Sequence, residues 1–342
     1  MTTVKLDSNE SPFGPSPRAI EAMRAAAAES HLYPDNDASE LRKKLAARHG
    51  VAPENIAVAA GLGELLDVIA RVLVGPGLNA VISERSFIVY GIVVKAAGAR
   101  LIEVPMRENT FDLDVIVGTV DSGTRCVLLA NPNNPTGTIV DAAAVDRFLD
   151  CLPEGVVIVL DEAYYDYAQF FVEQRGVEFS HSLDYVRQNR NVLVLRTFSK
   201  AHGLAGVRVG YGIGPVDLVA RLNAMRTIYS VSGVAQAGAL AALEDDEHVR
   251  RAVVNNAEQA DVLVRELSSL GLAVAPTWGN FIYCEVGEDA EDFAERLQRE
   301  GVIVRPLGPW GAPQAIRVTI GRREENQIFL AAFRKATGSS RR

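Results

Sequence analysis

The sequence predicts an α/β protein: a large domain with a mainly parallel, mixed sheet flanked by helices, and a smaller α+β domain. Short apolar runs alternate with helical or glycine-rich segments over 56–211, which is typical of βα units. After residue 243 strands follow one another between helices, which indicates a different architecture. The length of 342 residues also suits two domains. We expect an N-terminal arm and small-domain segment over 1–34, the large domain over 35–243 and the small domain over 244–342.

The elements of the large domain follow from apolar runs and their breaks. The stretch LDSNESPFGPSP at 6–17 contains three prolines and is expected to be an ordered arm. An alanine-rich helix is predicted over 18–29, and a second over 39–49, which Ser39 would cap and Gly50 would end. Strands are then predicted at 56–60, 80–83, 100–104, 126–130, 156–160, 192–195 and 207–211.

The small domain begins after an alanine-rich helix that ends near residue 243. The acidic residues 244–247 are expected to be a helix start or a linker. The elements predicted beyond them are a helix, strands at 272–275 and 281–286, a helix at 290–299, strands at 302–305 and 315–320, and a helix from 324.

Composition indicates an ordinary enzyme of the cytoplasm. The formal charge of −8 gives no general attraction for nucleic acid or anionic membrane, so we expect neither as a partner. The three cysteines, Cys126, Cys151 and Cys284, are far apart, which favours a reducing compartment over a disulfide framework. The opening residues show no apolar stretch typical of a secretory signal, and no apolar run has membrane-spanning length.

The stretch 191–212, NVLVLRTFSKAHGLAGVRVGYG, is the strongest candidate for chemistry. Its apolar run suits a strand buried on both faces, and Thr197, Ser199 and Lys200 follow at the edge where α/β sheets place ligands. A solvated lysine is the alternative, since most lysines are surface residues. The hydroxyls and the later Arg208 favour instead an anion-binding pocket around an amine made nucleophilic by desolvation and nearby positive charge.

Two other loops that follow strands could bind a ligand. AGLGE at 60–64 places Gly61 and Gly63 before a helix, where backbone N–H groups could hold a phosphate, although the spacing fits neither a dinucleotide fingerprint nor a P-loop. NPNNPTG at 131–137 could present the amide of Asn134 beyond a strand end. An ordinary strand-to-helix turn is the alternative for the first loop. Turn formation would explain the prolines and Gly137 of the second loop, but it does not require Asn134.

The strand VVIVLDEAY at 156–164 ends in two carboxylates. Burying such a group is costly without a cationic or donor partner, and the protonated ring nitrogen of a cofactor would be one. Neighbouring strand residues point to opposite faces, so Asp161 and Glu162 are not expected to share a site. The five histidines show no metal-ligand spacing, and we expect no metal.

These features together describe a pyridoxal phosphate site. The required groups are a lysine that bonds to the cofactor aldehyde, an anion cradle, an aspartate for the pyridine nitrogen and an asparagine for the phenolate oxygen.

At this point the chain resembles the fold-type I pyridoxal-phosphate-dependent aminotransferases, and within them the histidinol-phosphate aminotransferase family. The resemblance covers nearly the whole chain. It rests on LDSNESPFGPSP at 6–17, YPDND at 33–37, AGLGE at 60–64, NPNNPTG at 131–137, DEAY at 161–164, RTFSKAHGLAGVRVGY at 196–211, GNF at 279–281 and IRVTIGRREEN at 316–326.

The resemblance implies roles for the cofactor-binding residues. Lys200 would bond covalently to the cofactor and move the proton at the substrate Cα, and Asp161 would pair with the pyridinium nitrogen. Asn134 and Tyr164 would contact the phenolate oxygen, and Phe87 would stack on the ring. The phosphate would be held by Leu62, Gly63, Thr197, Ser199, Arg208 and, from the second subunit of a homodimer with shared active sites, Tyr33.

The resemblance also implies the substrate-binding residues. Arg317 would bind the carboxylate of the amino donor, and Arg305 would be a further anion contact. Asn9 and Asn280 would line the pocket, and Phe13 and Tyr229 would lie where substrate choice is made. The substrates implied are amino acids and keto acids.

Three departures from the family pattern bear on substrate choice. The turn ERSF at 84–87 keeps the aromatic ring of Phe87 but lacks the usual proline. The loop RTIYSVS at 226–232 replaces an R-x-P-F-N-V-N pattern, and Phe13 replaces a frequent tyrosine, which removes a hydroxyl that could bind a substrate phosphate.

Four readings of function remain open from the sequence. The first is amino transfer between glutamate with 2-oxoglutarate and histidinol phosphate with imidazole acetol phosphate. The second uses an aromatic amino acid, and the third is decarboxylation of a threonine-phosphate type. A cofactor-sensing domain of a regulator is the non-enzymatic reading, which the acidic charge does not favour.

Overall fold

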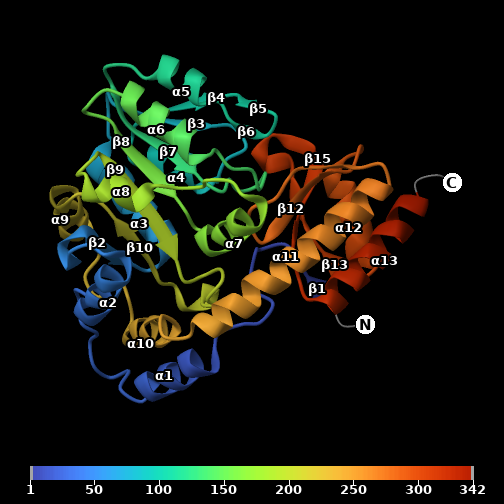
Figure 1. Ribbon diagram of the computed structural model, residues 1–342, viewed down its shortest axis with the longest axis horizontal. Coiled ribbons are helices and arrows are strands. Elements are labelled where there is room, and N and C mark those ends of the chain that lie inside the picture. Colours follow the sequence, from blue (N-terminus) through green and yellow to red (C-terminus); the bar gives the residue numbers. More distant parts are fainter. Residues whose placement is uncertain (1–2, 340–342) are drawn as a thin grey trace.

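The computed structural model describes residues 3–339 and contains two sheet-based parts, which Figure 1 shows side by side. The large part is built on a seven-stranded sheet of order β2-β10-β9-β8-β7-β3-β4. Its strands are β2 (Ile56–Ala59), β3 (Asn79–Ser83), β4 (Arg100–Val104), β7 (Thr124–Ala130), β8 (Val157–Asp161), β9 (Val192–Thr197) and β10 (Gly210–Ile213). Only β10 runs antiparallel to its neighbours among these strands, so the predicted mixed, mainly parallel sheet is confirmed.

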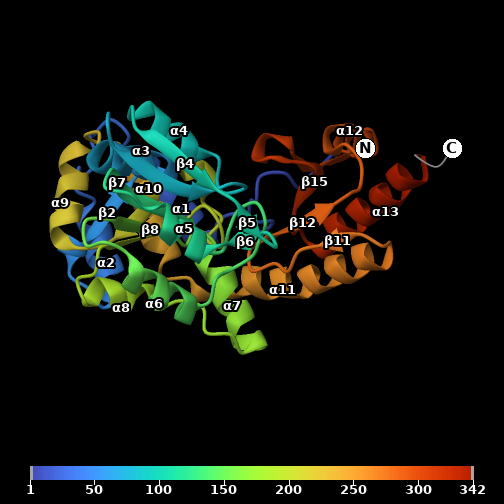
Figure 2. The same ribbon diagram turned by 90° about the horizontal axis from the view of Figure 1, so that it is seen from above.

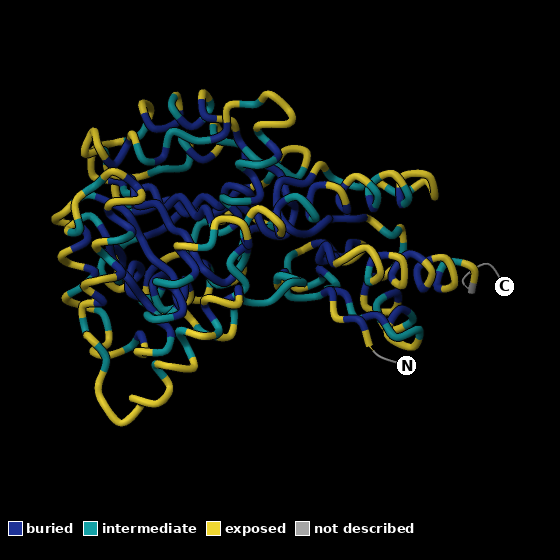
Figure 3. Tube along the Cα trace, turned by 60° about the horizontal axis from the view of Figure 1, so that its bottom comes forward, coloured by how far each residue is buried: buried dark blue, intermediate teal, exposed yellow. Residues whose placement is uncertain are grey.

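Helices cover both faces of the large sheet. Figure 2 shows α3 and α4 on one side and α6 and α8 on the other. The central strands are consequently buried on both faces, as their β-branched runs predict, and Figure 3 shows them as the dark interior of this part. The helices are α2 (Ser39–His49), α3 (Gly61–Leu73), α4 (Val89–Ala96), α5 (Leu113–Thr119), α6 (Ala142–Cys151), α7 (Tyr165–Arg175), α8 (Ser182–Arg187), α9 (Val216–Met225) and α10 (Gly233–Ala242).

The small part has a four-stranded antiparallel sheet of order β11-β12-β15-β14. Its elements are α11 (Asp246–Ser269), β11 (Ala273–Val274), β12 (Phe281–Glu285), α12 (Ala290–Arg299), β13 (Val302–Ile303), β14 (Arg305–Leu307), β15 (Ala312–Thr319) and α13 (Arg323–Ser339). The remaining elements are the short strands β5 (Met106–Arg107) and β6 (Thr110–Phe111) and the 3-10 turns η1 (Pro53–Asn55), η2 (Ala205–Val207) and η3 (Gly308–Trp310). Within residues 3–339, no helix is long and apolar enough to cross a membrane.

The N-terminal segment connects the two parts. Strand β1 (Val4–Lys5) pairs in parallel with β13 of the small part, whereas α1 (Pro17–Ala27) packs against α10 of the large part. Residues 6–16 therefore cross the junction between the two parts. We propose that the boundaries near residues 34 and 243 divide the chain into an arm, a large domain and a small domain.

Two local expectations need correction. The N-cap of α2 is Ala38 rather than Ser39, because Ser39 is already helical and its N–H donates to Asp35 Oδ2 at 2.7 Å. The strand expected at 207–211 begins only at residue 210, because Arg208 adopts a left-handed conformation with φ 62°. Gly50 ends α2 at φ 63°, as predicted.

Gly203 permits a close approach between the arm and the loop after Lys200. Its φ is +71°, and a Cβ at this position would collide with the backbone of Gly14. The backbone of the arm therefore lies directly against this loop.

Replacement of Gly203 by alanine should lower the free energy of unfolding by roughly 2–4 kcal/mol, because it adds both a left-handed strain and a backbone clash. Urea unfolding of the apoprotein measures this. Gly206→Ala is the matched control, because a Cβ there meets nothing within 4 Å. Equal stabilities of the two variants would contradict the close approach.

Candidate functional site

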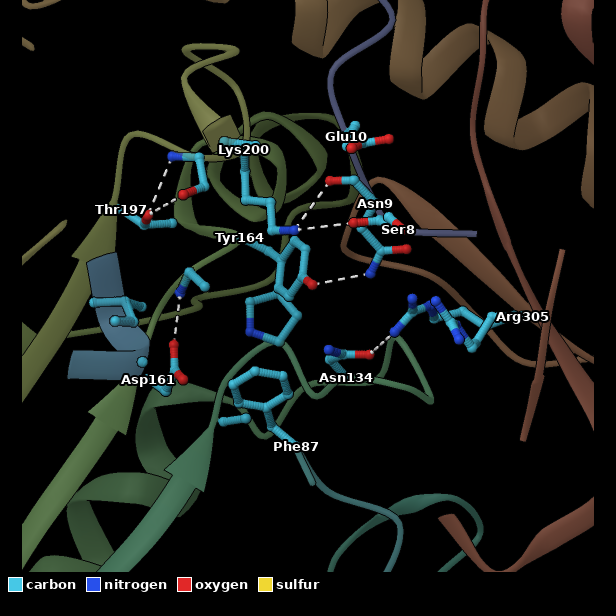
Figure 4. A pocket seen from close by; sticks show the side chains of 18 of the residues that line it. Ser8, Asn9, Glu10, Phe87, Asn134, Asp161, Tyr164, Thr197, Lys200 and Arg305 are labelled. Carbon is cyan, nitrogen blue, oxygen red and sulfur yellow. Dashed lines mark hydrogen bonds between the residues drawn. The ribbon is translucent and has the colours of Figure 1, made fainter. Parts of the chain in front are cut away.

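A cavity of about 480 Å³ lies at the carboxyl ends of the large-sheet strands and gathers most of the residues predicted for the site. Figure 4 shows its lining from close by, with the arm and the small part completing the wall. The predicted residues that line it are Asn9, Leu62, Gly63, Phe87, Asn134, Asp161, Tyr164, Thr197, Ser199, Lys200, Arg208, Arg305 and Arg317. This is the edge at which parallel strands present their following loops together.

Lys200 follows β9 and projects into the cavity. Its Nζ donates to the carbonyl oxygen of Asn9 at 3.0 Å and to that of Ser8 at 3.5 Å (Figure 4). Burial lowers the pKa of Lys200 to about 7, and the positive charge of Arg317 acts in the same direction. A large share of this amine is therefore neutral at neutral pH, which is the state a nucleophile requires.

Asp161 and Glu162 face different surroundings, as the strand geometry predicts. Asp161 Oδ2 accepts from the Tyr90 hydroxyl at 2.8 Å and Oδ1 from the N–H of Ala163 at 3.0 Å. Burial raises the pKa of Asp161 to about 6. Glu162 instead pairs with Arg196 through contacts of 2.8 and 3.0 Å, away from the cavity. Only Asp161 of the two is therefore placed to meet a ligand.

One end of the cavity is suited to an anion. Helix α3 begins at Gly61, so the N–H groups of its first turn, including those of Leu62 and Gly63, have no partner within the helix. Arg208 lies against the same turn, and a Cβ on Gly61 would collide with its guanidinium. The glycine therefore allows the arginine to approach the helix end.

Two hydroxyls complete this anion-binding end. Thr197 Oγ1 accepts from the N–H of Ser199 at 3.1 Å and donates to Ser199 Oγ at 3.0 Å. This hydrogen bond leaves the Ser199 hydroxyl proton free to donate to a ligand.

The middle of the cavity carries aromatic and amide groups. Phe87 follows β3 and packs edge-on against Tyr90, with ring centroids 5.6 Å apart. The Tyr164 hydroxyl accepts from Asn9 Nδ2 at 2.9 Å, and burial raises its pKa. Asn134 lies in the loop after β7 and accepts from Arg317 Nη1 at 2.6 Å.

The two arginines of the small part are bound by the arm. Arg317 Nη2 donates to the carbonyl oxygen of Asp7 at 2.7 Å, while its buried Nε has no partner. Arg305 donates to the same carbonyl at 3.4 Å and to the Asp7 carboxylate at 3.2 Å. Both guanidiniums thus face oxygen atoms where a substrate anion could bind.

Four predicted residues do not line this cavity. Asn280 is buried behind the arm and donates to the carbonyl oxygen of Asn9 at 3.1 Å. The Phe13 ring contacts the guanidiniums of two arginines, Arg251 at 4.4 Å and Arg322 at 4.9 Å.

The other two, Tyr33 and Tyr229, stack on each other with centroids 4.7 Å apart on the exposed surface. Both rings therefore lie outside this cavity.

Sequence reasoning missed further lining residues, among them Ser8, Glu10, Tyr90 and Trp310. Tyr90 could have been found, because it lies three residues after Phe87 at the start of a helix and so shares its face. Ser8 and Glu10 flank the predicted residue Asn9, and this position was a weak indication that they line the cavity. Trp310 had none, because only the packing of η3 brings it to the cavity.

These groups fit pyridoxal phosphate. The cavity offers an amine with a lowered pKa, a buried carboxylate, and a helix N-terminus with a guanidinium beside it. No group of three or more His, Cys, Asp or Glu side chains among the described residues is placed to hold a metal ion.

Comparisons with known proteins agree with this geometry. A family model described as aminotransferase class I and II matches residues 2–333. A histidinol-phosphate aminotransferase of Moorella thermoacetica is 41% identical over 333 residues, covering 97% of this chain and 85% of the relative. Histidinol-phosphate aminotransferase 2 of Pseudomonas aeruginosa is 44% identical over 332 residues, covering 97% and 88%. The solved histidinol-phosphate aminotransferase of Sinorhizobium meliloti in complex with pyridoxal-5'-phosphate has a TM-score of 0.91 at 30% identity, covering 99% and 92%.

The lowered pKa predicts the pH dependence of Lys200 reactivity. In the apoprotein, reductive methylation of Lys200 should rise through pH about 7, because its amine loses its proton there. Ordinary surface lysines titrate near 10.4. Peptide mass spectrometry measures the labelling, with the exposed Lys43 as internal reference. A Lys200 profile that matches that of Lys43 would contradict the prediction.

Proposed function

The chain belongs to the aminotransferase class I and II family, and we propose that it is a pyridoxal-phosphate-dependent histidinol-phosphate aminotransferase. It would exchange an amino group between glutamate with 2-oxoglutarate and histidinol phosphate with imidazole acetol phosphate. The observation that supports this proposal most strongly is that Lys200, Asp161 and two arginines line one cavity. The named relatives at 41% and 44% identity support the choice of substrate.

The residues that would hold the cofactor lie at the ends of five strands, β2, β3, β7, β8 and β9, and Arg208 lies just before β10. Asp161 would pair with the ring nitrogen, and a cationic partner there would offset the cost of burial that raises the pKa of this carboxyl. Asn134 and Tyr164 would contact the phenolate oxygen, and Phe87 would cover the ring face. The phosphate would be bound by the N–H groups of Leu62 and Gly63, the hydroxyls of Thr197 and Ser199, and Arg208.

Lys200 would carry out the proton transfer. When bound, pyridoxal phosphate supplies an electron sink that stabilises negative charge at the substrate Cα. The Lys200 amine would take the proton from Cα, and a pKa near 7 suits an acid and base that works at neutral pH. The carbonyl oxygen of Asn9, 3.0 Å away, would hold the amine in place.

Substrate anions would bind at Arg317 and Arg305. Arg317 would form a two-point contact with the α-carboxylate of glutamate, and Arg305 would bind the side-chain carboxylate or the phosphate. To do so each guanidinium must exchange its contact with Asp7 for one with the substrate.

An aromatic amino acid is the second candidate substrate. Phe87 and Trp310 both line the cavity and give it an aromatic wall that would favour a ring-bearing side chain. A threonine-phosphate-type decarboxylation would use much the same cofactor residues and stays the runner-up reaction.

A half-reaction screen should separate these possibilities. We expect glutamate and histidinol phosphate each to convert the bound cofactor to its amino form, with phenylalanine and tyrosine at least tenfold slower, since their neutral side chains form no ion pair with Arg305. The visible absorbance of the cofactor measures conversion. Lys200→Ala should retain cofactor but lose at least 100-fold in rate. Release of carbon dioxide from threonine phosphate without keto acid would favour the decarboxylase, and a failure of every amino donor would refute an aminotransferase.

We further propose a homodimer with shared active sites, located in the cytoplasm. Two pairs of consecutive residues expose large apolar side chains, Leu32 with Tyr33 and Ile228 with Tyr229. The two tyrosines stack on each other, and such an exposed apolar patch suits burial by a second copy. Tyr33 would then contact the phosphate in the site of the partner. The three cysteines are free, which supports a reducing compartment.

Subunit mixing tests the shared site. Tyr33→Ala should weaken cofactor binding about tenfold through loss of a charge-assisted hydrogen bond. When Tyr33→Ala and Lys200→Ala chains are mixed, activity should rise above that of either alone. The heterodimer regains one complete site, because the intact Lys200 meets an intact Tyr33 from its partner. No gain on mixing would contradict a site shared between subunits.

A further inference from the structure

Glu10 occupies a position in the cavity to which the proposed chemistry assigns no role. It follows Asn9, whose left-handed backbone at φ 54° turns the arm at the cavity wall. Asn280 Nδ2 approaches the carbonyl oxygen of Glu10 at 3.4 Å and so anchors the backbone. The side chain of Glu10 is 52% exposed at the cavity mouth (Figure 4).

The charges of the cavity give Glu10 a distinct place. Among the described residues that line it, three are arginines, Arg208, Arg305 and Arg317, and a fourth, Lys200, is partly protonated at neutral pH. Two of the described lining residues carry carboxylates, Asp161 and Glu10. Asp161 is buried at the cofactor end and is bound by Tyr90. Glu10 is therefore the carboxylate available to the distal part of a substrate.

The surroundings of Glu10 leave it free to bind a cation. Its partner is Lys5 on the same segment, at 2.8 Å, and both side chains are about half exposed. Exposed pairs of this kind contribute little and exchange readily. Lys5 also contacts Asp7 at 3.4 Å, and the field of Glu10 reaches Lys200, whose pKa it raises against the larger effect of burial. Arg305 and Arg317 face the same cavity from the small sheet.

We propose that Glu10 is a specificity-determining residue that binds the protonated imidazole ring of the substrate. The proposal rests on the proposed function, because it concerns the ring of histidinol phosphate. A substrate with an anionic group and a cationic ring meets both Arg305 and Glu10. A neutral aromatic ring gains nothing from Glu10, and a second anion, as in glutamate, is repelled by it.

The proposal predicts an effect whose sign depends on pH and on substrate. Imidazole titrates near pH 6.5, so the ring is cationic at pH 5.5 and neutral at pH 8. A solvent-exposed ion pair changes binding by up to about fivefold. In the holoenzyme, Glu10→Gln should raise KM for histidinol phosphate about fivefold at pH 5.5 and leave it equal or lower at pH 8. The same variant should not raise KM for glutamate at either pH.

Two further variants sharpen the experiment. Lys5→Met removes the competing cation and should lower KM for histidinol phosphate at pH 5.5. Glu21→Gln, an exposed carboxylate on α1, is the matched control and should change neither substrate. Because the field of Glu10 raises the pKa of Lys200, Glu10→Gln also shifts the titration of that amine. Glutamate reacts through the same amine, so the change in its KM reports any indirect effect that acts through Lys200.

The outcomes separate this inference from the proposed function. A KM ratio for histidinol phosphate that is the same at both pH values, or an equal rise for glutamate, would overturn the role of Glu10 while leaving the aminotransferase intact. A wild-type enzyme that does not convert histidinol phosphate at any pH would refute the substrate, and with it the role of Glu10.

Discussion

The site depends on one set of hydrogen bonds, those by which backbone carbonyl oxygens of the arm bind Lys200 and Arg317. Lys200 is bound by the carbonyls of Ser8 and Asn9, and Arg317 by that of Asp7. A buried charge without such partners would cost several kcal/mol. The carbonyls are dipoles without net charge, so they solvate the cations without neutralising them. The cavity therefore keeps the positive field that attracts substrate anions.

The arm can do this because both of its ends are fixed. Strand β1 pairs with β13 on one side, and Gly203 lets the backbone of Gly14 approach on the other. Between them, the N–H of Asn9 donates to Thr319 Oγ1 at 2.8 Å. The arm is thus bonded to both parts of the protein.

Two consecutive carboxylates, Asp161 and Glu162, are both buried but have different partners. Glu162 and Arg196 satisfy each other in the interior, and Arg196 also lies over the ring of Tyr165 at 3.4 Å. Asp161, one residue earlier, has only neutral donors as partners and a pKa of about 6. Because successive strand residues point to opposite faces, Glu162 forms an ion pair in the interior and Asp161 faces the cavity. The unpaired group is the one that a bound cation would stabilise.

The sequence by itself determined the strands, the sheet edge and the loops that carry chemistry, because apolar periodicity and glycine, proline and polar residues at strand ends are local signals. Asp161, Lys200 and Asn134 were all named from such signals, and the structure brings them to one cavity. Tertiary structure alone decided that the carbonyls of the arm bind Lys200, that Asp7 holds Arg305 and Arg317, and that Glu10 and Trp310 reach the cavity. It also placed Phe13 between two arginines and Tyr33 on the surface. These contacts join residues about 190 to 310 positions apart in the sequence. A local sequence pattern cannot indicate which distant backbone carbonyl will accept a hydrogen bond from a buried cation.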